Sequence, residues 1–537
     1  MSLPRTLALA CLALTASTPA QQTPTPAAAA WWRETTALAN DGMEGRDTGS
    51  EAYERAARYV AAQLQAAGLR PAGDGGTFFQ RVPMHQTDLD AAHSSAEVED
   101  ASGGTAGKFG KVALRLLQEV TLQPAERLPP DIRAAMTFIG YGLETGPDAA
   151  PPAGSDRGKV LVYFAGAPSN LSPADRQTFA ARRSQRLAGS GAAAVIAIPN
   201  PSDIEPFHWP AAYARSVTLS ETPVAASTIP SLRVSADGAA TLFSRSGHDV
   251  ASILGDGARG ASLPSFPLHA NLHLHLETTS KAISSPNILA ILPGSDPALS
   301  AEYVALSAHL DGYGFGTPVL GDRLYNGALD DAAYVATLLE LARTEAALPP
   351  AARPRRSLLL CIFTGEEKGL LGSAWFTRHP TVPIPHIVTD LNLDQLRPIF
   401  PLKILTMEGI ADSTLGDTAR TLAGRYGIEL RPDLEPERNL FRRADNINFV
   451  RVGVPIASFI FGYNRGTPEE ATYRDWYARR YHKPQDDLST PIDWNAAVTF
   501  NRFFRDLARA VGDAPTRPSW SPASSYAPTK TAPGSEP

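Results

Sequence analysis

The pattern of apolar and polar positions predicts strands that alternate with helices along much of the chain. Residues 303–308, "YVALSA", and 357–363, "SLLLCIF", are short and almost wholly apolar, as buried strands are. Residues 330–348 between them repeat apolar positions at helical spacing, and 387–394, "IVTDLNLD", form another strand-like run. This alternation predicts an α/β fold, in which a mostly parallel mixed sheet is sandwiched by helices.

The middle of the chain has a different texture. Residues 126–265 contain short β-like runs such as "GKVLVYFAG" and "AAAVIAIPN", separated by loops rich in Pro, Gly and Ser. We therefore expect a β-rich domain inserted into a larger one. The larger domain would be built from residues 31–125 and 266–512.

The two ends of the chain are expected to lie outside the folded domains. Residues 1–20 have an early Arg5, an apolar stretch and a small residue at the end, which is typical of a secretory signal peptide too short to span a membrane. We expect a secreted or periplasmic protein, with no lipid anchor because Cys11 lies too early. Residues 21–30 are expected to be a flexible lead-in and residues 513–537 a disordered tail.

Composition narrows the function further. The 49 Lys and Arg against 55 Asp and Glu give a net charge of −6, with no basic run for nucleic acid, and no later apolar run approaches transmembrane length. Of the two cysteines, Cys361 is left alone once the signal is removed. We read it as a core residue, because it lies inside an apolar strand.

Charged residues follow several of the predicted strands directly. His309 ends one strand, with Asp311 two residues on, while Glu366 and Glu367 follow a second strand and Asp394 ends a third. Ligands of open α/β sheets bind beyond the carboxyl ends of the strands. Three further candidates lie where a loop turns into a helix or far downstream: Asp330, Asp331 and His482.

These residue types together point to metal binding. Any one of them alone would be read as a solvated surface group or a core histidine. Packed together, the carboxylates would resist ionising unless a cation neutralised them. Histidine and carboxylate ligands suit Zn²⁺, and the supply exceeds one tetrahedral ion, so two ions about 3.5–4 Å apart are expected. By contrast, His273 and His275 alternate along one strand and are expected to lie on a sheet surface.

Five motifs in order identify a family resemblance: "SAHLDGYG", "NGALDDAA", "FTGEEKGLLGS", "NLDQL" and "YHKPQDDL". The chain resembles the secreted di-zinc aminopeptidases, co-catalytic zinc exopeptidases related to bacterial leucyl aminopeptidases and to glutamate carboxypeptidase. The resemblance covers roughly residues 31–125 and 266–512. The inserted part resembles a protease-associated domain.

The resemblance implies a role for each motif residue. Asp311 would orient a ligand histidine, Tyr481 would hydrogen-bond the developing oxyanion, Glu366 would be the general base, and the Asp330–Asp331 peptide would be cis. Tyr481 as simple packing is the alternative. Two Zn²⁺ ions are the only cofactors expected, and five residues would bind them. His309 and Asp394 would bind one ion, Glu367 and His482 would bind the other, and Asp330 would bridge the two.

The adjacent glutamates are expected to divide the work between them. Consecutive side chains that leave an extended segment point in roughly opposite directions, so Glu367 can bind metal while Glu366 faces the water. Asp486 and Asp487, behind His482, are open to two interpretations, a helix cap or hydrogen-bond partners of the site.

The function implied by the resemblance is hydrolysis of N-terminal peptide bonds by a zinc aminopeptidase with a peptide substrate. A carboxypeptidase of the glutamate-releasing type is the alternative within the class. A non-catalytic, receptor-like relative is the alternative outside it, and it is disfavoured because every expected ligand and the base are present.

Overall fold

The computed structural model describes residues 24–100, 110–143, 155–202, 209, 211–223, 229–394 and 397–527. The expected signal peptide at 1–20 lies outside these residues. Within the described part of the chain, no helix combines the length and the apolar character needed to cross a membrane.

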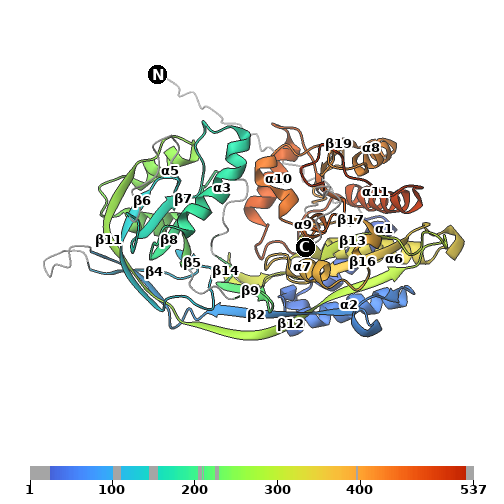
Figure 1. Cartoon of the computed structure of the whole chain (residues 1–537), viewed down its shortest axis with the longest axis horizontal. Coiled ribbons are helices and arrows are strands. Elements are labelled where there is room, and N and C mark those ends of the chain that lie inside the picture. The colour runs from blue at the N-terminus through green and yellow to red at the C-terminus, as the bar shows by residue number, and fades with distance from the viewer. Residues whose placement is uncertain are drawn as a thin grey trace, which may run out of the picture.

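The chain forms two lobes, and the long strands β2 (Phe79–Leu89) and β12 (Thr278–Leu292) of the larger lobe run towards the smaller lobe (Figure 1). The larger lobe is built on a ten-stranded sheet, in which β1 (Arg70–Pro71) pairs with β12 outside the main strand order. The other strands follow one another across the sheet in the order β19 (Glu429–Arg431), β18 (Ile404–Glu408), β20 (Ile456–Phe461), β17 (Ile387–Asn392), β13 (Tyr303–His309), β16 (Ser357–Phe363), β12, β2 and β9 (Arg215–Leu219).

The larger sheet is mixed, and its centre is parallel. Strands β20, β17, β13 and β16 run parallel to one another, whereas β12, β2 and β9 continue the sheet in antiparallel pairing. The α/β fold with a mixed sheet is therefore confirmed. The carboxyl ends of the central strands meet at one edge, which is where the expected site residues follow them.

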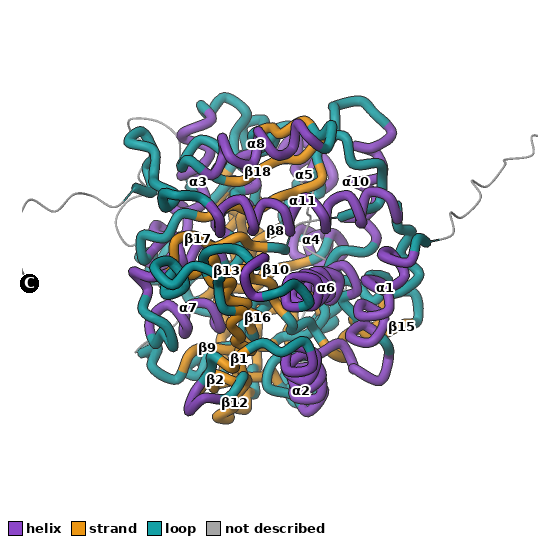
Figure 2. Tube along the Cα trace, turned by 90° about the vertical axis from the view of Figure 1, so that its right-hand side faces the viewer, coloured by secondary structure: helices purple, strands orange, loops and turns teal. Residues whose placement is uncertain are grey.

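Helices cover both faces of this sheet, and Figure 2 shows its strands between α7 on one side and α6, α1 and α2 on the other. One face packs against α1 (Pro26–Ala39), α2 (Glu51–Ala66), α6 (Ala333–Ala346), α8 (Leu415–Arg425), α10 (Pro468–Arg479) and α11 (Trp494–Asp513). The other face packs against α7 (Leu371–Arg378) and α9 (Asn446–Arg451).

The unbroken apolar run of β16 follows from this double cover. Leu358, Leu360 and Ile362 belong to the core on one face, while Leu359 and Cys361 belong to the core on the other. Because side chains alternate across a strand, a strand buried on both faces needs apolar residues at every position. Cys361 is fully buried, as expected for a core residue.

In its described residues, the smaller lobe is an eight-stranded sheet with three helices, α3 (Pro173–Ala188), α4 (Ala236–Phe243) and α5 (Val250–Ala258). A separate hairpin, β14 (Gly314–Val319) and β15 (Asp322–Tyr325), belongs to neither sheet. The strands of the lobe lie in the order β4 (Val112–Leu114), β3 (Ser95–Asp100), β11 (Ser265–His275), β6 (Asp131–Ile139), β7 (Val160–Phe164), β8 (Ala194–Ile198), β10 (Ser231–Val234) and β5 (Val120–Leu122).

The expected limits of the inserted domain, residues 126–265, are wrong at both ends. Strands β3, β4 and β5, placed by the sequence in the catalytic part, pair within the smaller sheet, and β11 extends that sheet to His275. Conversely, β9 lies within the expected insert but pairs with β2 of the larger sheet. The error arises because the local pattern of a strand does not reveal which sheet it joins.

The described parts of the expected lead-in and of the expected tail are ordered. Part of the expected lead-in is the start of α1, capped by the Thr25 side chain and with Ala28 fully buried. In the expected tail, Trp520 pairs with Ser413 and donates a 2.8 Å hydrogen bond to the Gly453 carbonyl. The tail residues from 528 onward lie outside the described part of the chain.

Trp31 fixes α1 against α6, the helix that begins just after the candidate site. Its indole nitrogen donates to the Ala333 carbonyl at 2.7 Å and the side chain is 1% exposed. We expect Trp31→Ala to lower the free energy of unfolding of the larger lobe by about 3–5 kcal/mol. Urea unfolding followed by circular dichroism measures this. Leu320→Ala, at a position 94% exposed, is the matched control and should change it by less than about 0.5 kcal/mol.

Candidate metal centre

The expected metal ligands converge at the carboxyl edge of the central strands. His309 is the last residue of β13, and Asp394 follows β17. Glu367 follows β16, Asp330 lies in the irregular turn Ala328–Ala332 before α6, and His482 follows α10. Since β13 lies between β16 and β17 and is parallel to both, their ends bring these residues to one place.

The ligand atoms form two groups that share one residue. His309, Asp330 and Asp394 each place one ligand atom within 4.8 Å of the others, and so do Asp330, Glu367 and His482. His309 Nε2 lies 3.3 Å from Asp330 Oδ1, and His482 Nε2 lies 3.4 Å from Asp330 Oδ2. Each oxygen of one carboxylate thus faces a different histidine, which is the arrangement that a carboxylate bridging two ions requires. Two imidazoles and three carboxylates fit Zn²⁺ in type and number.

Glu366 lies beside these groups without belonging to either. Its Oε2 is 3.9 Å from His309 Nε2, whereas Glu367 Oε2 is 3.4 Å from His482 Nε2. The two glutamates do diverge as expected, but not by strand alternation. They lie in a turn, where the amides of Gly369 and Leu370 both donate to the Glu366 carbonyl.

Burial controls the ionisation of these carboxyl groups. Burial raises the pKa of Glu366 well above its usual range; His309 counteracts this, while Asp394 and Glu367 add to it. Burial likewise raises the pKa of Glu367 and of Asp394. Burial pushes in the same direction at Asp330, but hydrogen bonds with the two histidines hold its pKa well below its usual range. Such a cluster is most stable with cations that compensate its negative charge.

Asp311 acts mainly on the backbone of the glutamate turn. Its carboxylate accepts hydrogen bonds from the amides of Glu366 at 3.0 Å and Glu367 at 3.3 Å, and from the Thr48 hydroxyl at 2.9 Å. The expected contact with the His309 ring is longer, 3.8 Å from Nδ1 to Oδ1. His309 Nδ1 instead lies 3.1 Å from the Asp311 backbone carbonyl, which fixes the ring.

Of the two acidic residues behind His482, Asp486 is a hydrogen-bond partner of the site, whereas Asp487 does not cap the next helix, α11, whose N-cap is Asp493. The Asp486 carboxylate accepts hydrogen bonds from the amides of Leu329 and Asp330, both at 3.0 Å, so it anchors the turn that carries the shared aspartate. Asp487 accepts from the Ser489 amide at 2.8 Å and thus stabilises its own loop. The Asp330–Asp331 peptide is cis, as the resemblance implied.

Tyr481 packs flat against a proposed ligand. Its ring stacks on the His482 ring with centroids 3.7 Å apart, and the residue is 4% exposed. It also borders the cavity between the two lobes. The structure therefore shows the packing interaction, and the part of Tyr481 in chemistry stays a prediction.

Arg397 is a buried part of the site that the sequence reading missed. It donates to the Asp394 carbonyl at 2.6 Å, and its Nη2 lies 3.6 Å from Asp330 Oδ2. Its guanidinium lies 4.3 Å from the centre of the Trp476 ring. The only sequence clue was an arginine three residues after Asp394, in a segment that otherwise looks like a loop.

Lys368 was also missed, although it follows the glutamate pair directly. Its ammonium lies between the rings of Tyr213 and Tyr313, 5.0 and 4.8 Å from their centres, and 3.2 Å from Asp47 Oδ1. The Tyr313 hydroxyl is in turn 3.2 Å from Nδ1 of His482. A buried cation thus compensates charge next to the site and connects it to a segment that arrives from the smaller lobe.

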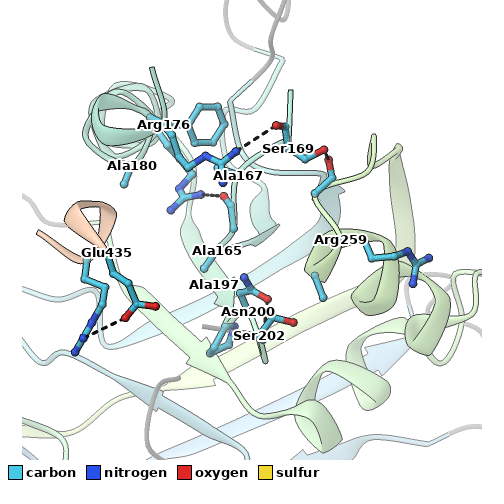
Figure 3. Close-up of a pocket in the computed structure, with 18 of the residues that line it drawn as sticks. Ala165, Ala167, Ser169, Arg176, Ala180, Ala197, Asn200, Ser202, Arg259 and Glu435 are labelled. Carbon is cyan, nitrogen blue, oxygen red and sulfur yellow. Dashed lines mark hydrogen bonds and ion pairs between the residues drawn. The ribbon is translucent and has the colours of Figure 1, made fainter. Parts of the chain in front are cut away.

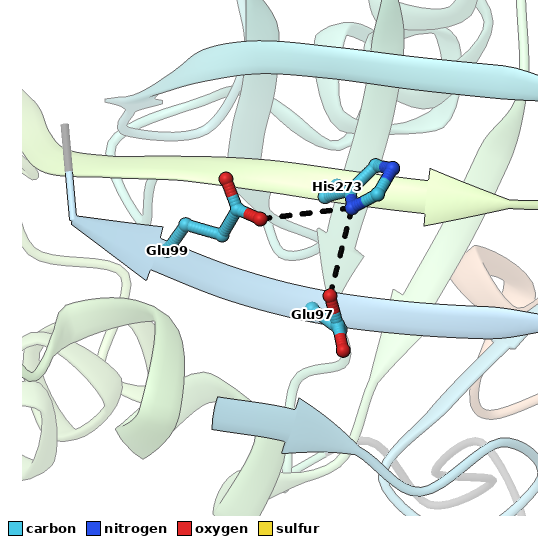
Figure 4. A group of neighbouring side chains, drawn as sticks. All are labelled: Glu97, Glu99 and His273. Carbon is cyan, nitrogen blue, oxygen red and sulfur yellow. Dashed lines mark ion pairs between the residues drawn. The ribbon is translucent and has the colours of Figure 1, made fainter. Parts of the chain in front are cut away.

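A third group with metal-type ligands lies on the smaller sheet (Figure 4). His273 Nδ1 is 3.5 Å from Glu97 and 3.6 Å from Glu99 of the neighbouring strand. Lys111 lies 2.8 Å from Glu99 and 3.0 Å from Glu97, and Arg133 lies 2.7 Å from Glu99. Two cations already balance the two carboxylates, so this is an ion-pair cluster on a sheet surface, the location expected for His273.

Comparison with known sequences identifies the class of protein. Residues 287–508 match peptidase family M28. A vacuolar membrane protease of Tuber melanosporum is 32% identical over 107 residues, which are 20% of this chain and 10% of that protein. A probable glutamate carboxypeptidase of Arabidopsis thaliana is 28% identical over 168 residues, 31% of this chain and 22% of that protein. The matched segments thus span about a tenth and about a fifth of these relatives.

Solved structures share the fold over most of the chain. An aminopeptidase from Aneurinibacillus sp. strain AM-1 superposes with a TM-score of 0.54 at 19% identity, covering 90% of this chain and 93% of that one. A zinc aminopeptidase from Bacillus subtilis gives 0.53 at 18% identity, covering 90% and 93%. A peptidase M28 precursor from Shewanella amazonensis gives 0.51 at 17% identity, covering 91% and 97%. The chain carries a peptidase M28 domain, and the resemblance predicted from its motifs is confirmed.

Because Asp330 belongs to both ligand groups, its loss should affect both ions. We expect Asp330→Ala to reduce bound zinc from about two ions per chain to well below one, whereas Asp394→Ala should retain about one. Mass spectrometry of the metal content after zinc loading and desalting measures this, with circular dichroism to confirm folding. Equal losses in the two variants would contradict a shared ligand.

Proposed function

We propose that the chain is a di-zinc aminopeptidase that removes N-terminal residues from peptides. The observation that carries this proposal is the pair of ligand groups that share Asp330, with Glu366 beside them and outside both. The match of residues 287–508 to peptidase family M28 supports the proposal that the site binds metal. The aminopeptidases among the solved structures of the same fold favour this direction of cleavage.

In this proposal each ligand group holds one Zn²⁺, with His309 and Asp394 at one ion, Glu367 and His482 at the other, and Asp330 between them. When bound, such a pair of ions supplies a water of lowered pKa and polarises the scissile carbonyl.

Glu366 is the proposed general base. Its carboxylate would accept the proton of the attacking water and pass it to the leaving amine. Its position supports this role: Glu366 lies beside the two ligand groups, with Oε2 3.9 Å from His309 Nε2, and belongs to neither of them. The two amide hydrogen bonds that Asp311 accepts hold Glu366 and Glu367 in their different positions.

Replacement of the base should separate chemistry from metal binding. We expect Glu366→Gln to retain both zinc ions and to lower kcat by about 10²–10⁴-fold, since general-base catalysis contributes that much. Glu367→Gln is the adjacent control, and we expect it to lose metal. Hydrolysis of an aminoacyl reporter and zinc content, each before and after a chelator, measure both effects. Full activity after complete metal removal would contradict the proposal.

The hydroxyl group of Tyr481 is proposed to donate a hydrogen bond to the developing oxyanion. Its place beside His482 and at the border of the cavity supports this role. We expect Tyr481→Phe to lower kcat by roughly 10²-fold with little change in KM or in thermal stability, because one oxyanion donor is worth about that much. An unchanged kcat would instead assign Tyr481 to packing alone.

The alternative direction of cleavage rests on one of the relatives. The Arabidopsis thaliana protein that matches part of the chain is a probable glutamate carboxypeptidase. A comparison of aminoacyl reporters with N-acylated peptides that end in glutamate distinguishes the two. Cleavage of only the N-acylated peptides would exclude the aminopeptidase, because their amino terminus is blocked.

The destination of the chain is also a proposal. We infer a secreted or periplasmic enzyme from the charged, apolar and small-residue pattern of residues 1–20. The smaller lobe would be a protease-associated domain, a proposal supported by its β-rich sheet and its position between two parts of the larger lobe. A receptor-like protein without activity is disfavoured because the chain retains all five proposed ligands and Glu366, and these residues lie close together.

A further inference from the structure

A cavity of about 750 Å³ lies between the two lobes and reaches the candidate metal centre. His482 and Tyr481 border it on the side of the larger lobe, and Phe179 and Arg183 of α3 border it on the side of the smaller lobe. Figure 1 shows α3 facing α10 across this region. The volume lies within the range of about 300–1,000 Å³ typical of ligand pockets.

The charged residues that line this cavity are almost all positive. Glu435 is the single carboxylate among the described lining residues. It lies 2.8 Å from Arg474 and 3.5 Å from Arg438. Two carboxylates outside the lining also pair with lining arginines: Glu470 lies 2.7 Å from Arg474, and Asp256 lies 2.6 Å from Arg259. Seven arginines line the cavity: Arg176, Arg183, Arg233 and Arg259 from the smaller lobe, and Arg438, Arg443 and Arg474 from the larger lobe.

Two arginines of α3 are held in place by backbone carbonyl groups. Arg176 donates to the Ser169 carbonyl at 3.2 Å, and Arg183 donates to the Gly166 carbonyl at 2.8 Å. Figure 3 shows Arg176 and Ser169 on the smaller lobe, with Glu435 on a separate segment across the cavity. Hydrogen bonds to carbonyls orient a guanidinium without cancelling its charge.

We propose that this cavity binds carboxylate groups of the peptide substrate, so that the enzyme prefers short acidic peptides, their free C-terminal carboxylate included. This inference rests on the proposed function. A guanidinium matches a carboxylate with two parallel hydrogen bonds, and a cleft lined with one sign of charge concentrates ligands of the other sign. The occupant is a peptide because the cavity is bordered by His482, one of the proposed ligands at the site where the peptide bond would be cut.

The test uses two tetrapeptides with the same first two residues, one ending in two glutamates and the other in two glutamines with an amidated terminus. A third substrate, an aminoacyl p-nitroanilide, is too short to extend far into the cavity. We expect kcat/KM of the wild-type, zinc-loaded enzyme to be at least about tenfold higher for the acidic tetrapeptide. The preference should fall in 0.5 M salt, because salt screens charges at exposed sites.

The variant Arg176→Gln removes one cavity charge of the smaller lobe, whose guanidinium donates to a backbone carbonyl. We expect it to lower kcat/KM for the acidic peptide about tenfold, mainly by raising KM. The value of kcat/KM for the p-nitroanilide should stay within twofold of the wild-type value. The matched control is Arg182→Gln, which removes one exposed charge of the same helix outside the cavity lining and should change neither value.

Two results would overturn the inference: equal kcat/KM for the two tetrapeptides in the wild type, or the same loss in the control variant. If the wild type cleaves none of the three substrates, the proposed function fails instead. Calorimetric titration with the two tetrapeptides then decides the cavity inference separately, and equal affinities would overturn it.

Discussion

The structure is organised around negative charge buried at one edge of a sheet. Asp330, Glu366, Glu367 and Asp394 lie at the ends of central strands or beside them, where burial works against ionisation. A carboxylate group withdrawn from water is costly unless an opposite charge compensates it. The two histidines and Arg397 provide part of that compensation. Each oxygen of the Asp330 carboxylate faces the histidine of a different ligand group.

The backbone around the site is held by buried polar groups rather than by the ligands themselves. Asp311 fixes the glutamate turn through two amides, and Asp486 fixes the turn of Asp330 through two more. Arg46, which is fully buried, donates to the carbonyls of Leu310 and Gly327, at 2.8 and 2.9 Å, in the two segments that carry His309 and Asp330. Ligand positions set in this way do not depend on the ligands' own flexible side chains.

The smaller lobe is joined to this site by direct contacts. Strand β9 leaves it to pair with β2 of the larger sheet, and Tyr213, just before β9, packs against Lys368 next to Glu367. Arg215 then lies 2.6 Å from Asp88 Oδ1 on β2. The lobe therefore contributes to the surroundings of the candidate site as well as to the walls of the cavity in front of it.

The sequence alone determined the fold class and the identity of the candidate ligands, because strand ends and motif order are local properties: His309, Glu367 and Asp394 all follow strands that the apolar pattern predicts. Only the tertiary structure assigned strands β3, β4, β5 and β9 to their sheets and revealed Arg397 and Lys368 as buried charges. It also brought arginines from both lobes around one cavity. Strand pairing and charge compensation depend on contacts between residues far apart in the chain, and no local pattern of apolar and polar positions records them.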